Sequence, residues 1–390
     1  MTTKTKTTWR TVRLGDVATD VRDLYQPTKE KHLPYIGLEH IEQQTLRLLG
    51  VGDSRDVQSI KKRFKNGDVL FGSLRVYFRK VIRSKIDGVC STDITVLRPK
   101  NAQLDPMFLF YLVGNNQFID RATGQGEGTR MPRAGWSVIS DFDIEIPKEI
   151  GEQKRIAEIL STFDEMIENN NRIIKTLEEM AQAIFRKRFG VFPEALSKGW
   201  EMKKLGDLGR IITGKTPSTK DKENFGNNYP FITIPDLQNG VFVVRTERFL
   251  SEQGAGTMSA SKLPVGAICV SCIATVGLVA IATRESFTNQ QINSIIPKSE
   301  VLRPFVFLLL RGMRSGLQAY ASGGTAAPII SKGAFEKIEV VMPPEKILSD
   351  FYESVNPMFE KIMVVLEENQ KLIAMRDLLL PRLMSGEIRI

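Results

Sequence analysis

The sequence predicts an α+β protein built as a tandem repeat, in which two globular units alternate with two long helices. Two observations support this prediction: a heptad pattern of apolar residues over 153–189 and again over 355–383, and short motifs that return in the second half. At 390 residues the chain is also longer than one hydrophobic core ordinarily supports, which favours several domains. We expect the units and helices to follow the boundaries 1–150, 151–189, 190–344 and 345–390.

Apolar residues of the first helical segment recur at alternating spacings of four and three, which is typical of a helix that buries one seam. The seam residues are Ile156, Leu160, Phe163, Ile167, Asn170, Ile174, Leu177, Ala181 and Ile184. The second segment repeats them 199 residues later, as Val355, Phe359, Ile362, Leu366, Asn369, Ile373, Arg376, Leu380 and Leu383. A helix over 153–189 would be about 55 Å long, so its stripe needs a partner, and the other long helix is the obvious one.

Each seam carries an asparagine at its midpoint, Asn170 in the first and Asn369 in the second. An antiparallel pair related by a pseudo-twofold axis would bring the two amides together, where each satisfies the other. A parallel pair in register would match them too, so the asparagines fix register more than direction. We predict an antiparallel coiled coil. Arg376 stands where Leu177 lies in the first seam, which indicates a break in symmetry or a partner contact, and Pro381 is expected to end the second helix.

The globular units share motifs in the same order. The first opens with Leu14-Gly15-Asp16 and the second with Leu205-Gly206-Asp207. Further on, Pro106 and Pro304 each introduce an apolar helix, a position where proline suits the first turn. Short alternating runs between glycine-rich turns predict strands, so each unit mixes strands with helices.

The composition favours a polyanionic partner, because 54 Lys and Arg residues exceed 45 Asp and Glu residues and give a net charge of +9. The polar N-terminus does not resemble a signal peptide, and no apolar run has the roughly 20 residues that a membrane span needs. Three cysteines and two histidines provide no disulfide framework. We therefore expect a cytoplasmic protein that holds no metal.

The motifs that suggest catalysis have weak contexts. Residues 209–216, Gly-Arg-Ile-Ile-Thr-Gly-Lys-Thr, match the phosphate-binding P-loop pattern, but no apolar strand precedes them and Pro217 follows where a helix should begin. A plain turn, or a loop whose Lys215 and Thr216 contact a phosphate backbone, are the alternatives. No acid pair, catalytic triad or histidine cluster is present, so we expect neither a catalytic site nor a cofactor.

A basic segment over 61–85 contains nine Lys or Arg residues against one acid. If the part around Tyr77 is a strand, Arg75, Tyr77 and Arg79 share one face. Two guanidiniums beside an aromatic ring suit phosphates, or guanine edges through bidentate hydrogen bonds. The alternative interpretation is an ordinary solvated strand face.

The second unit carries amides instead, Asn289-Gln290-Gln291 followed by Ile292 and Asn293. Amide side chains recognise adenine in the major groove, and as a strand this segment would place Asn289, Gln291 and Asn293 on one face. A polar edge strand is the alternative. Two loops at equivalent positions are further candidates for close approach to DNA. They contain Thr129, Arg130 and Arg133 in the first unit and Gly324 and Thr325 in the second.

Taken together, the repeat, the paired helices and several motifs resemble the specificity subunit of type I restriction-modification systems. The resemblance covers nearly the whole chain. Its motifs are Gly67-Asp-Val-Leu-Phe-Gly72, Leu74 to Lys80, Ser91-Thr92-Asp93, Thr213-Gly-Lys215-Thr216-Pro217, Ile234-Pro-Asp236-Leu, Thr288-Asn289-Gln290 and the ending Leu378-Leu-Leu-Pro-Arg-Leu-Met-Ser-Gly386-Glu-Ile388.

The resemblance implies two target recognition domains that read the halves of a bipartite double-stranded DNA target, with the antiparallel helices as a spacer. It also implies two partner methyltransferase (modification) subunits, and restriction subunits that translocate and cleave. The residues expected at the DNA are Arg75, Tyr77, Arg79, Lys80, Thr92, Asp93, Thr129, Arg130, Arg133, Lys215, Thr216, Asp236, Asn289, Gln290, Gln291, Gly324 and Thr325. The alternatives are a coiled-coil adaptor without a DNA role and a nucleotide-using enzyme built on residues 209–216.

Overall fold

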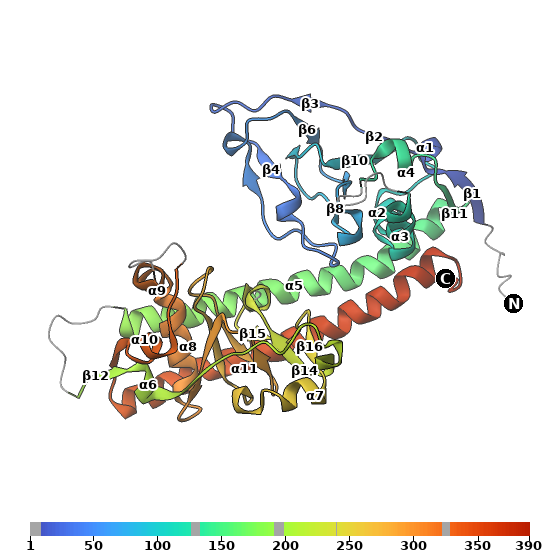
Figure 1. Ribbon diagram of the computed structural model, residues 1–390. Helices are drawn as coiled ribbons and strands as arrows, with labels where there is room; N and C mark the ends of the chain where they lie inside the picture. Colours follow the sequence, from blue (N-terminus) through green and yellow to red (C-terminus); the bar gives the residue numbers. More distant parts are fainter. Residues whose placement is uncertain (1–8, 126–132, 191–198, 239, 322–327) are drawn as a thin grey trace, which may run out of the picture. The chain divides into compact units, whose positions relative to one another are not determined.

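The computed structural model describes residues 9–125, 133–190, 199–238, 240–321 and 328–390, which form two compact units (Figure 1). The first unit comprises Met1–Glu168 together with Gln370–Ile390, and the second is Asn169–Asn369. Each unit therefore combines a globular part with segments of both long helices. The expected α+β class is confirmed.

The first unit contains a short antiparallel pair, a four-stranded sheet and a five-stranded sheet. The pair is β1 (Trp9–Arg13) with β11 (Asp143–Pro147). The four-stranded sheet has the order β2 (Ala18–Asp20), β10 (Ile94–Pro99), β7 (Val69–Gly72) and β8 (Val81–Arg83). The five-stranded sheet has the order β3 (Leu24–Tyr25), β6 (Lys61–Phe64), β9 (Gly88–Cys90), β4 (Pro34–Ile36) and β5 (Gly52–Asp53).

The helices of the first globular part are short. They are α1 (Leu14–Val17), α2 (Pro106–Gly114), α3 (Asn116–Gly124) and α4 (Trp136–Ile139), with 3₁₀ turns η1 (Leu38–His40), η2 (Ser54–Asp56) and η3 (Val76–Phe78). Pro106 occupies the first turn of α2 as predicted, and the Asp105 carboxylate caps it by accepting hydrogen bonds from the next two free backbone N–H groups. Nearly all of α2 is buried, so it forms the centre of this unit's core.

The second globular part repeats this plan. Strand β12 (Glu201–Lys204) pairs with β21 (Glu339–Met342). One sheet has the order β13 (Gly209–Thr213), β20 (Ile292–Pro297), β17 (Ile268–Ser271), β18 (Val279–Ala282) and β15 (Phe242–Val243), and the other β16 (Phe249–Leu250), β14 (Phe225–Ile232) and β19 (Phe287–Thr288). The helices are α6 (Leu205–Leu208), α7 (Glu252–Gly256), α8 (Leu302–Gly312), α9 (Arg314–Ala321) and α10 (Lys332–Glu336), with 3₁₀ turns η4 (Lys222–Asn224), η5 (Ile234–Gln238) and η6 (Ser259–Ser261).

The repeat inferred from the motifs is structural. The two Leu-Gly-Asp motifs both fold into four-residue helices, α1 and α6. Gly67 and Gly266, which precede the equivalent strands β7 and β17, have φ angles of 93° and 84°. A side chain is disfavoured in this left-handed conformation, so glycine occupies both positions.

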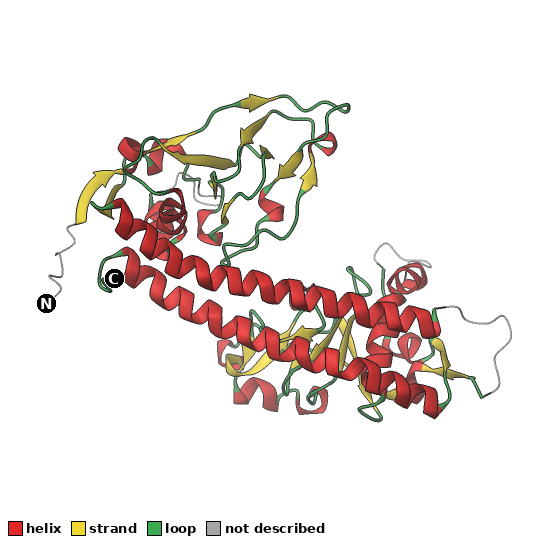
Figure 2. Ribbon diagram, turned by 180° about the vertical axis from the view of Figure 1, so that it is seen from behind, coloured by secondary structure: helices red, strands yellow, loops and turns green. Residues whose placement is uncertain are grey.

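The two long helices are α5 (Ile150–Phe189) and α11 (Glu345–Met384), and within each unit their segments run side by side in opposite directions (Figure 2). In the first unit Leu160 shares a core with Leu380 and Leu383. In the second, the rings of Phe189 and Phe351 lie 5.0 Å apart between centroids. The predicted antiparallel pairing is confirmed in both units.

Parts of the predicted seam are wrong. Ile184, Leu366 and Ile373 are only half-buried, and their neighbours Phe185, Val365 and Leu372 are buried instead. A straight α-helix drifts by about 20° per heptad from an ideal 3.5-residue repeat, so the buried stripe moves to an adjacent position. The helices also pack against the globular parts as well as each other, which widens the stripe beyond a two-helix seam.

The second long helix continues through Pro381, which we expected to end it, and also contains Pro357. Pro357 lies within α11, and Pro381 lies in its last turn, where the N–H of Ser385 still bonds to the Pro381 carbonyl at 3.0 Å. The helix ends at Met384, followed by Gly386 at a φ angle of 71°, which suits a helix C-terminus. Across the described ranges, no helix is both long enough and apolar enough to cross a membrane.

Candidate nucleic-acid interface

The predicted strand around Tyr77 is wrong. Val76–Phe78 forms the 3₁₀ turn η3, and Arg75 and Arg79 flank it with left-handed φ angles of 52° and 51°. This turn reverses the direction of the chain between the antiparallel strands β7 and β8. The three side chains therefore do not share one strand face, and their environments differ.

Arg75 and Tyr77 are exposed at this turn. Tyr77 is 40% exposed and its ring lies against Phe78, with 4.5 Å between ring centroids. Among the residues that the structure describes, none hydrogen-bonds to or forms an ion pair with the Arg75 guanidinium. A depression of about 260 Å³ lies beside it, lined by Leu38, Leu74, Arg75, Phe78 and Lys80. An apolar floor with a free guanidinium suits a base edge and its neighbouring phosphate.

Arg79, in contrast, is buried with 2% exposure. Its Nε donates to the Gly114 carbonyl at 2.6 Å, its Nη1 donates to the Gln44 carbonyl at 3.2 Å, and the same Nη1 lies 3.5 Å from the Asp377 carboxylate. These contacts occupy the guanidinium inside the protein, so we exclude Arg79 from the proposed interface. Lys80 is half-buried, donates from Nζ to the Leu38 carbonyl, and has its pKa lowered by burial.

The rest of the basic segment does not form a continuous cationic face. Lys61 is buried and donates to Ser59, and burial lowers its pKa. Lys62 lies 3.6 Å from Asp20. The Arg63 guanidinium covers the Tyr25 ring at 4.5 Å. A charge count along the sequence cannot detect this internal use, because long basic side chains bury their stems and reach internal partners.

A second turn lies next to the first. Thr92 is exposed, and Asp93 forms an ion pair with Arg133 at 3.0 Å. The Asp93 carbonyl accepts hydrogen bonds from the backbone N–H and the hydroxyl of Ser73, at 2.8 and 2.7 Å. Leu74 and Arg133 form an isolated antiparallel bridge. The structure thus brings the Arg75 loop, the 91–93 turn and Arg133 together. Thr129 and Arg130 lie outside the described residues.

In the second unit, the amide segment is also a turn rather than a strand. Residues 289–291 connect β19 to β20, and among the four amide residues only Asn293 lies in a strand, where it is buried. The Asn289 side chain closes the turn by accepting from the Gln291 N–H at 3.1 Å and donating to the Gln291 side chain at 3.0 Å. Gln290 is exposed at the tip, and its Oε1 accepts from the Thr216 hydroxyl at 2.5 Å.

Lys215 and Thr216 lie next to this turn because Gly214 allows a close approach. A Cβ at Gly214 would lie 2.2 Å from the Asn289 carbonyl oxygen, and the Lys215 N–H donates to the Thr288 carbonyl at 2.9 Å. Lys215 is exposed. Gly209–Thr213 forms β13, paired with β20, so these residues are extended and do not wrap a phosphate. The nucleotide-binding alternative is therefore not favoured.

Asp236 is not at a surface. It is buried, and its carboxylate accepts from the N–H and hydroxyl of Thr233 at 2.7 and 2.8 Å and from the Glu247 N–H at 3.2 Å. These bonds stabilise the start of η5, which is a structural role, and we exclude Asp236 from the proposed interface. Gly324 and Thr325 lie outside the described part of the chain.

The two turn pairs occupy equivalent scaffolds, which the sequence alone did not reveal. The Ser73 N–H bonds to the Asp93 carbonyl, and the Cys272 N–H bonds to the Gln291 carbonyl, both at 2.8 Å. The carbonyls of Ser73 and Cys272 then accept from the N–H of Ala134 and Ile330, at 2.9 and 2.8 Å. Each unit therefore presents the same arrangement of loops with different side chains. The signal available in the sequence was that both turns directly precede equivalent strands.

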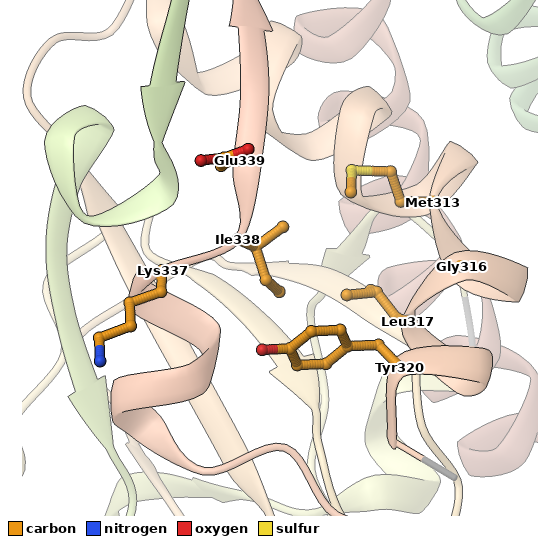
Figure 3. Close-up of a pocket in the computed structure, with 7 residues that line it drawn as sticks. All are labelled: Met313, Gly316, Leu317, Tyr320, Lys337, Ile338 and Glu339. Carbon is orange, nitrogen blue, oxygen red and sulfur yellow. The ribbon is translucent and has the colours of Figure 1, made fainter. Parts of the chain in front are cut away.

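The second unit also contains an apolar hollow of about 360 Å³, shown in Figure 3. It lies between α9 and the segment that enters β21, and it is lined by Met313, Gly316, Leu317, Tyr320, Lys337, Ile338 and Glu339. None of these residues was predicted as a site residue. No group of three or more potential metal-binding His, Cys, Asp or Glu side chains occurs over the described ranges.

The register asparagines meet as predicted. Asn170 and Asn369 are 8% and 4% exposed, and the Asn170 Nδ2 donates to the Asn369 Oδ1 at 3.0 Å. The Asn170 Nδ2 also lies 3.2 Å from a Glu368 carboxylate oxygen, and the Asn369 Nδ2 donates to Asn171 at 3.2 Å. The fold and the paired turns thus define a duplicated protein whose two similar scaffolds carry different side chains.

The comparisons with known proteins identify the family. The family model described as the type I restriction modification DNA specificity domain matches residues 6–179 and 197–357, so the chain belongs to this family and carries two copies of its domain. The type I restriction enzyme HindI specificity subunit of Haemophilus influenzae is 32% identical, over 97% of this chain and 99% of that protein. The MjaVIII specificity subunit of Methanocaldococcus jannaschii is 22% identical, over 98% of this chain and 93% of that protein.

The fold is shared with a solved structure, the S subunit of a type I restriction-modification system from M. genitalium. It has a TM-score of 0.58 and 16% sequence identity, and the match covers 98% of both chains. The relatives are named specificity subunits, and this chain is a type I specificity subunit of the same family.

Proposed function

We propose that the chain reads a bipartite double-stranded DNA target, one half with each globular unit. In the first unit the contacts come from Arg75, Tyr77, Lys80, the 91–93 turn and Arg133. In the second they come from Lys215, Thr216 and the 289–291 turn. The observation that supports this proposal is the equivalence of the two turn pairs, because a duplicated scaffold with different side chains suits two half-sites of different sequence.

The side chains favour different bases. The free guanidinium of Arg75 suits a guanine, which offers two acceptors in the major groove. The Gln290 amide suits an adenine, and its contact with Thr216 orients it before DNA arrives. Each such bidentate contact contributes about 1–3 kcal/mol of discrimination between bases.

The proposed recognition domains are 1–150 and 190–344, and the helices over 151–189 and 345–390 act as spacer and docking site. Two methyltransferase subunits bind this chain and supply catalysis, and restriction subunits add translocation and cleavage. The chain needs no cofactor of its own, and it works in the cytoplasm, where the DNA is. Shortening both helices by whole turns should change the spacing between half-sites without changing either half-site sequence.

The test starts from the target sequence, which methylome sequencing of a host carrying this gene provides. DNA binding by the complex with its methyltransferase is then measured at fixed salt, on duplexes with substitutions in one half-site at a time. Arg75→Ala should weaken discrimination in the first half-site only. Uniform loss on every sequence would identify Arg75 as a phosphate contact, and no preference of the unaltered complex for its target would contradict the proposed function.

A further inference from the structure

A polar network around buried arginines in the first unit connects the recognition loop, residues 75–79, to the second long helix. Arg376 on α11 is 1% exposed, and its Nη1 donates to the Asp164 carboxylate on α5 at 2.6 Å. The other oxygen of Asp164 accepts from the Tyr111 hydroxyl at 2.6 Å. The Arg376 Nη2 lies 3.0 Å from Asp377, the same carboxylate that lies 3.5 Å from Arg79.

The Arg376 guanidinium keeps its charge in this network. Burial alone would lower the pKa of Arg376, but the carboxylates of Asp164 and Asp377 raise it overall. Burial, together with the Asp164 charge, raises the pKa of Tyr111, so its hydroxyl remains a donor. Arg376 therefore bonds to both carboxylates, and Arg79 lies against that of Asp377. Each guanidinium also donates to main-chain carbonyls.

Two of those carbonyls belong to the turn around Gln44, which lies next to the proposed DNA contacts. The Arg376 Nη1 donates to the Thr45 carbonyl at 3.1 Å, and Arg79 donates to the Gln44 carbonyl at 3.2 Å. Gln44 in turn bonds to the recognition loop, with its side chain on the Tyr77 carbonyl at 2.7 Å and its N–H on the Phe78 carbonyl at 3.0 Å. Helix α11 thus bonds to the turn around Gln44 through Arg376, and this turn together with Arg79 fixes the loop around Tyr77.

The backbone of Arg79 indicates that its side chain is needed. The Gly72 N–H bonds to the Lys80 carbonyl, and the Ser271 N–H bonds to the Leu278 carbonyl, so Arg79 corresponds to Gly277 in the second unit. Both have left-handed φ angles, 51° and 87°. Glycine adopts this conformation without strain, whereas arginine does so at a cost. The first unit therefore keeps an unfavourable backbone residue whose side chain makes the contacts described above.

We propose that Arg79 and Asp377 are positioning residues for the first half-site: they fix the loop that presents Arg75 and Tyr77 and so couple its base discrimination to the helix α11. This inference rests on the proposed function. Neither residue touches DNA. In the second unit Gly277 and Leu177 stand where the first has Arg79 and Arg376, so the equivalent network is absent from the described residues and the second half-site is independent of it.

The test uses the complex of the full chain with its methyltransferase and the target duplex found by methylome sequencing. The variants are Arg79→Gly, which keeps the left-handed backbone without strain, and Asp377→Asn, which keeps the size of the side chain. Arg311→Met is the matched control, because Arg311 pairs at 2.8 Å with Glu178, the counterpart of Asp377 in the second unit. The readout is the ratio of Kd for half-site variants to Kd for the target, with the salt dependence of binding.

Both test variants should lower the ratio for the first half-site about tenfold or more and leave the ratio for the second half-site and the salt slope unchanged. Arg311→Met should leave the first ratio unchanged. The inference is overturned if the Kd ratios for both half-sites keep their original values, or if both fall together. It is also overturned if Arg79→Gly reduces the salt slope by about one, because that change would identify Arg79 as a phosphate contact. If Arg79→Gly does not fold, Asp377→Asn decides. An unaltered complex without target preference would instead contradict the proposed function.

Discussion

The buried amide pair of the long helices provides the sharpest stability prediction. Asn170→Leu removes the donor of the 3.0 Å bond and leaves the Asn369 carbonyl oxygen facing an apolar side chain. A buried polar group without a partner costs about 1–3 kcal/mol, so we expect the free energy of unfolding to fall by this amount. Asn369→Leu should have a similar effect for the same reason.

The double variant should recover this loss. With both amides replaced by leucine, no buried group lacks a partner, and the remaining contacts, Glu368 and the partly exposed Asn171, can bond to water. Replacing both members of a buried polar pair is neutral or stabilising, so we expect the double variant at or above the original stability, with a coupling energy of about 1–3 kcal/mol.

Urea unfolding followed by circular dichroism measures all four proteins of this cycle, and Asn169→Leu, at an exposed neighbouring position, should change stability by less than about 0.5 kcal/mol. The double variant should also lose register, because the polar pair no longer penalises a shift of one helix along the other. Additive losses in the single and double variants, without coupling, would refute the pairing as the source of stability.

Three further predictions follow from other parts of the molecule. Gln290→Ala should weaken discrimination between bases in the second half-site by about 1–3 kcal/mol and leave the first half-site unchanged. Competition between duplexes with single half-site substitutions measures this effect, and a change at both half-sites would contradict the assignment. The thiols of Cys90, Cys269 and Cys272 should react with a disulfide reagent at pH 8 only as fast as the chain unfolds, because burial raises their pKa values far above that pH. Fast reaction of the folded protein would contradict their burial. These pKa values are about 12 for Cys90, about 12 for Cys269 and about 11 for Cys272. Removal of residues 370–390 should unfold the first unit while the second keeps its protection in hydrogen exchange, because Leu380, Leu383 and Met384 belong to the first unit's core; retained protection of α2 would refute this.

The features that were predictable from the sequence have strong local periodicity or an internal copy. The helices α5 and α11 follow from their apolar spacing, and the pairing of Asn170 with Asn369 follows from their equal places in two copies of one pattern. The equivalence of α1 and α6 follows from a repeated motif, although their helical form was not predicted. In each case a comparison within the chain replaced the missing information about tertiary contacts.

The errors concern residues whose roles depend on contacts far along the chain. Alternation around Tyr77 favours a strand, but the reversal between β7 and β8 requires a turn there. In the sequence Arg79 resembles a surface cation, but in the fold its guanidinium contacts the Asp377 carboxylate and two main-chain carbonyls. Asp236 likewise resembles a contact residue, although three donors within 11 residues occupy its carboxylate. A single sequence shows which charged and polar groups are present but not which of them lie close together in the fold.

We propose that two chemically different surfaces on one chain read two halves of one DNA target. The most direct test is methylome sequencing of a host that expresses this chain with its methyltransferase, compared with hosts that carry Arg75→Ala or Gln290→Ala. We expect one bipartite motif in the first host, relaxed only in one half by Arg75→Ala and only in the other half by Gln290→Ala. A single continuous motif, or a motif that both variants relax in the same half, would contradict it.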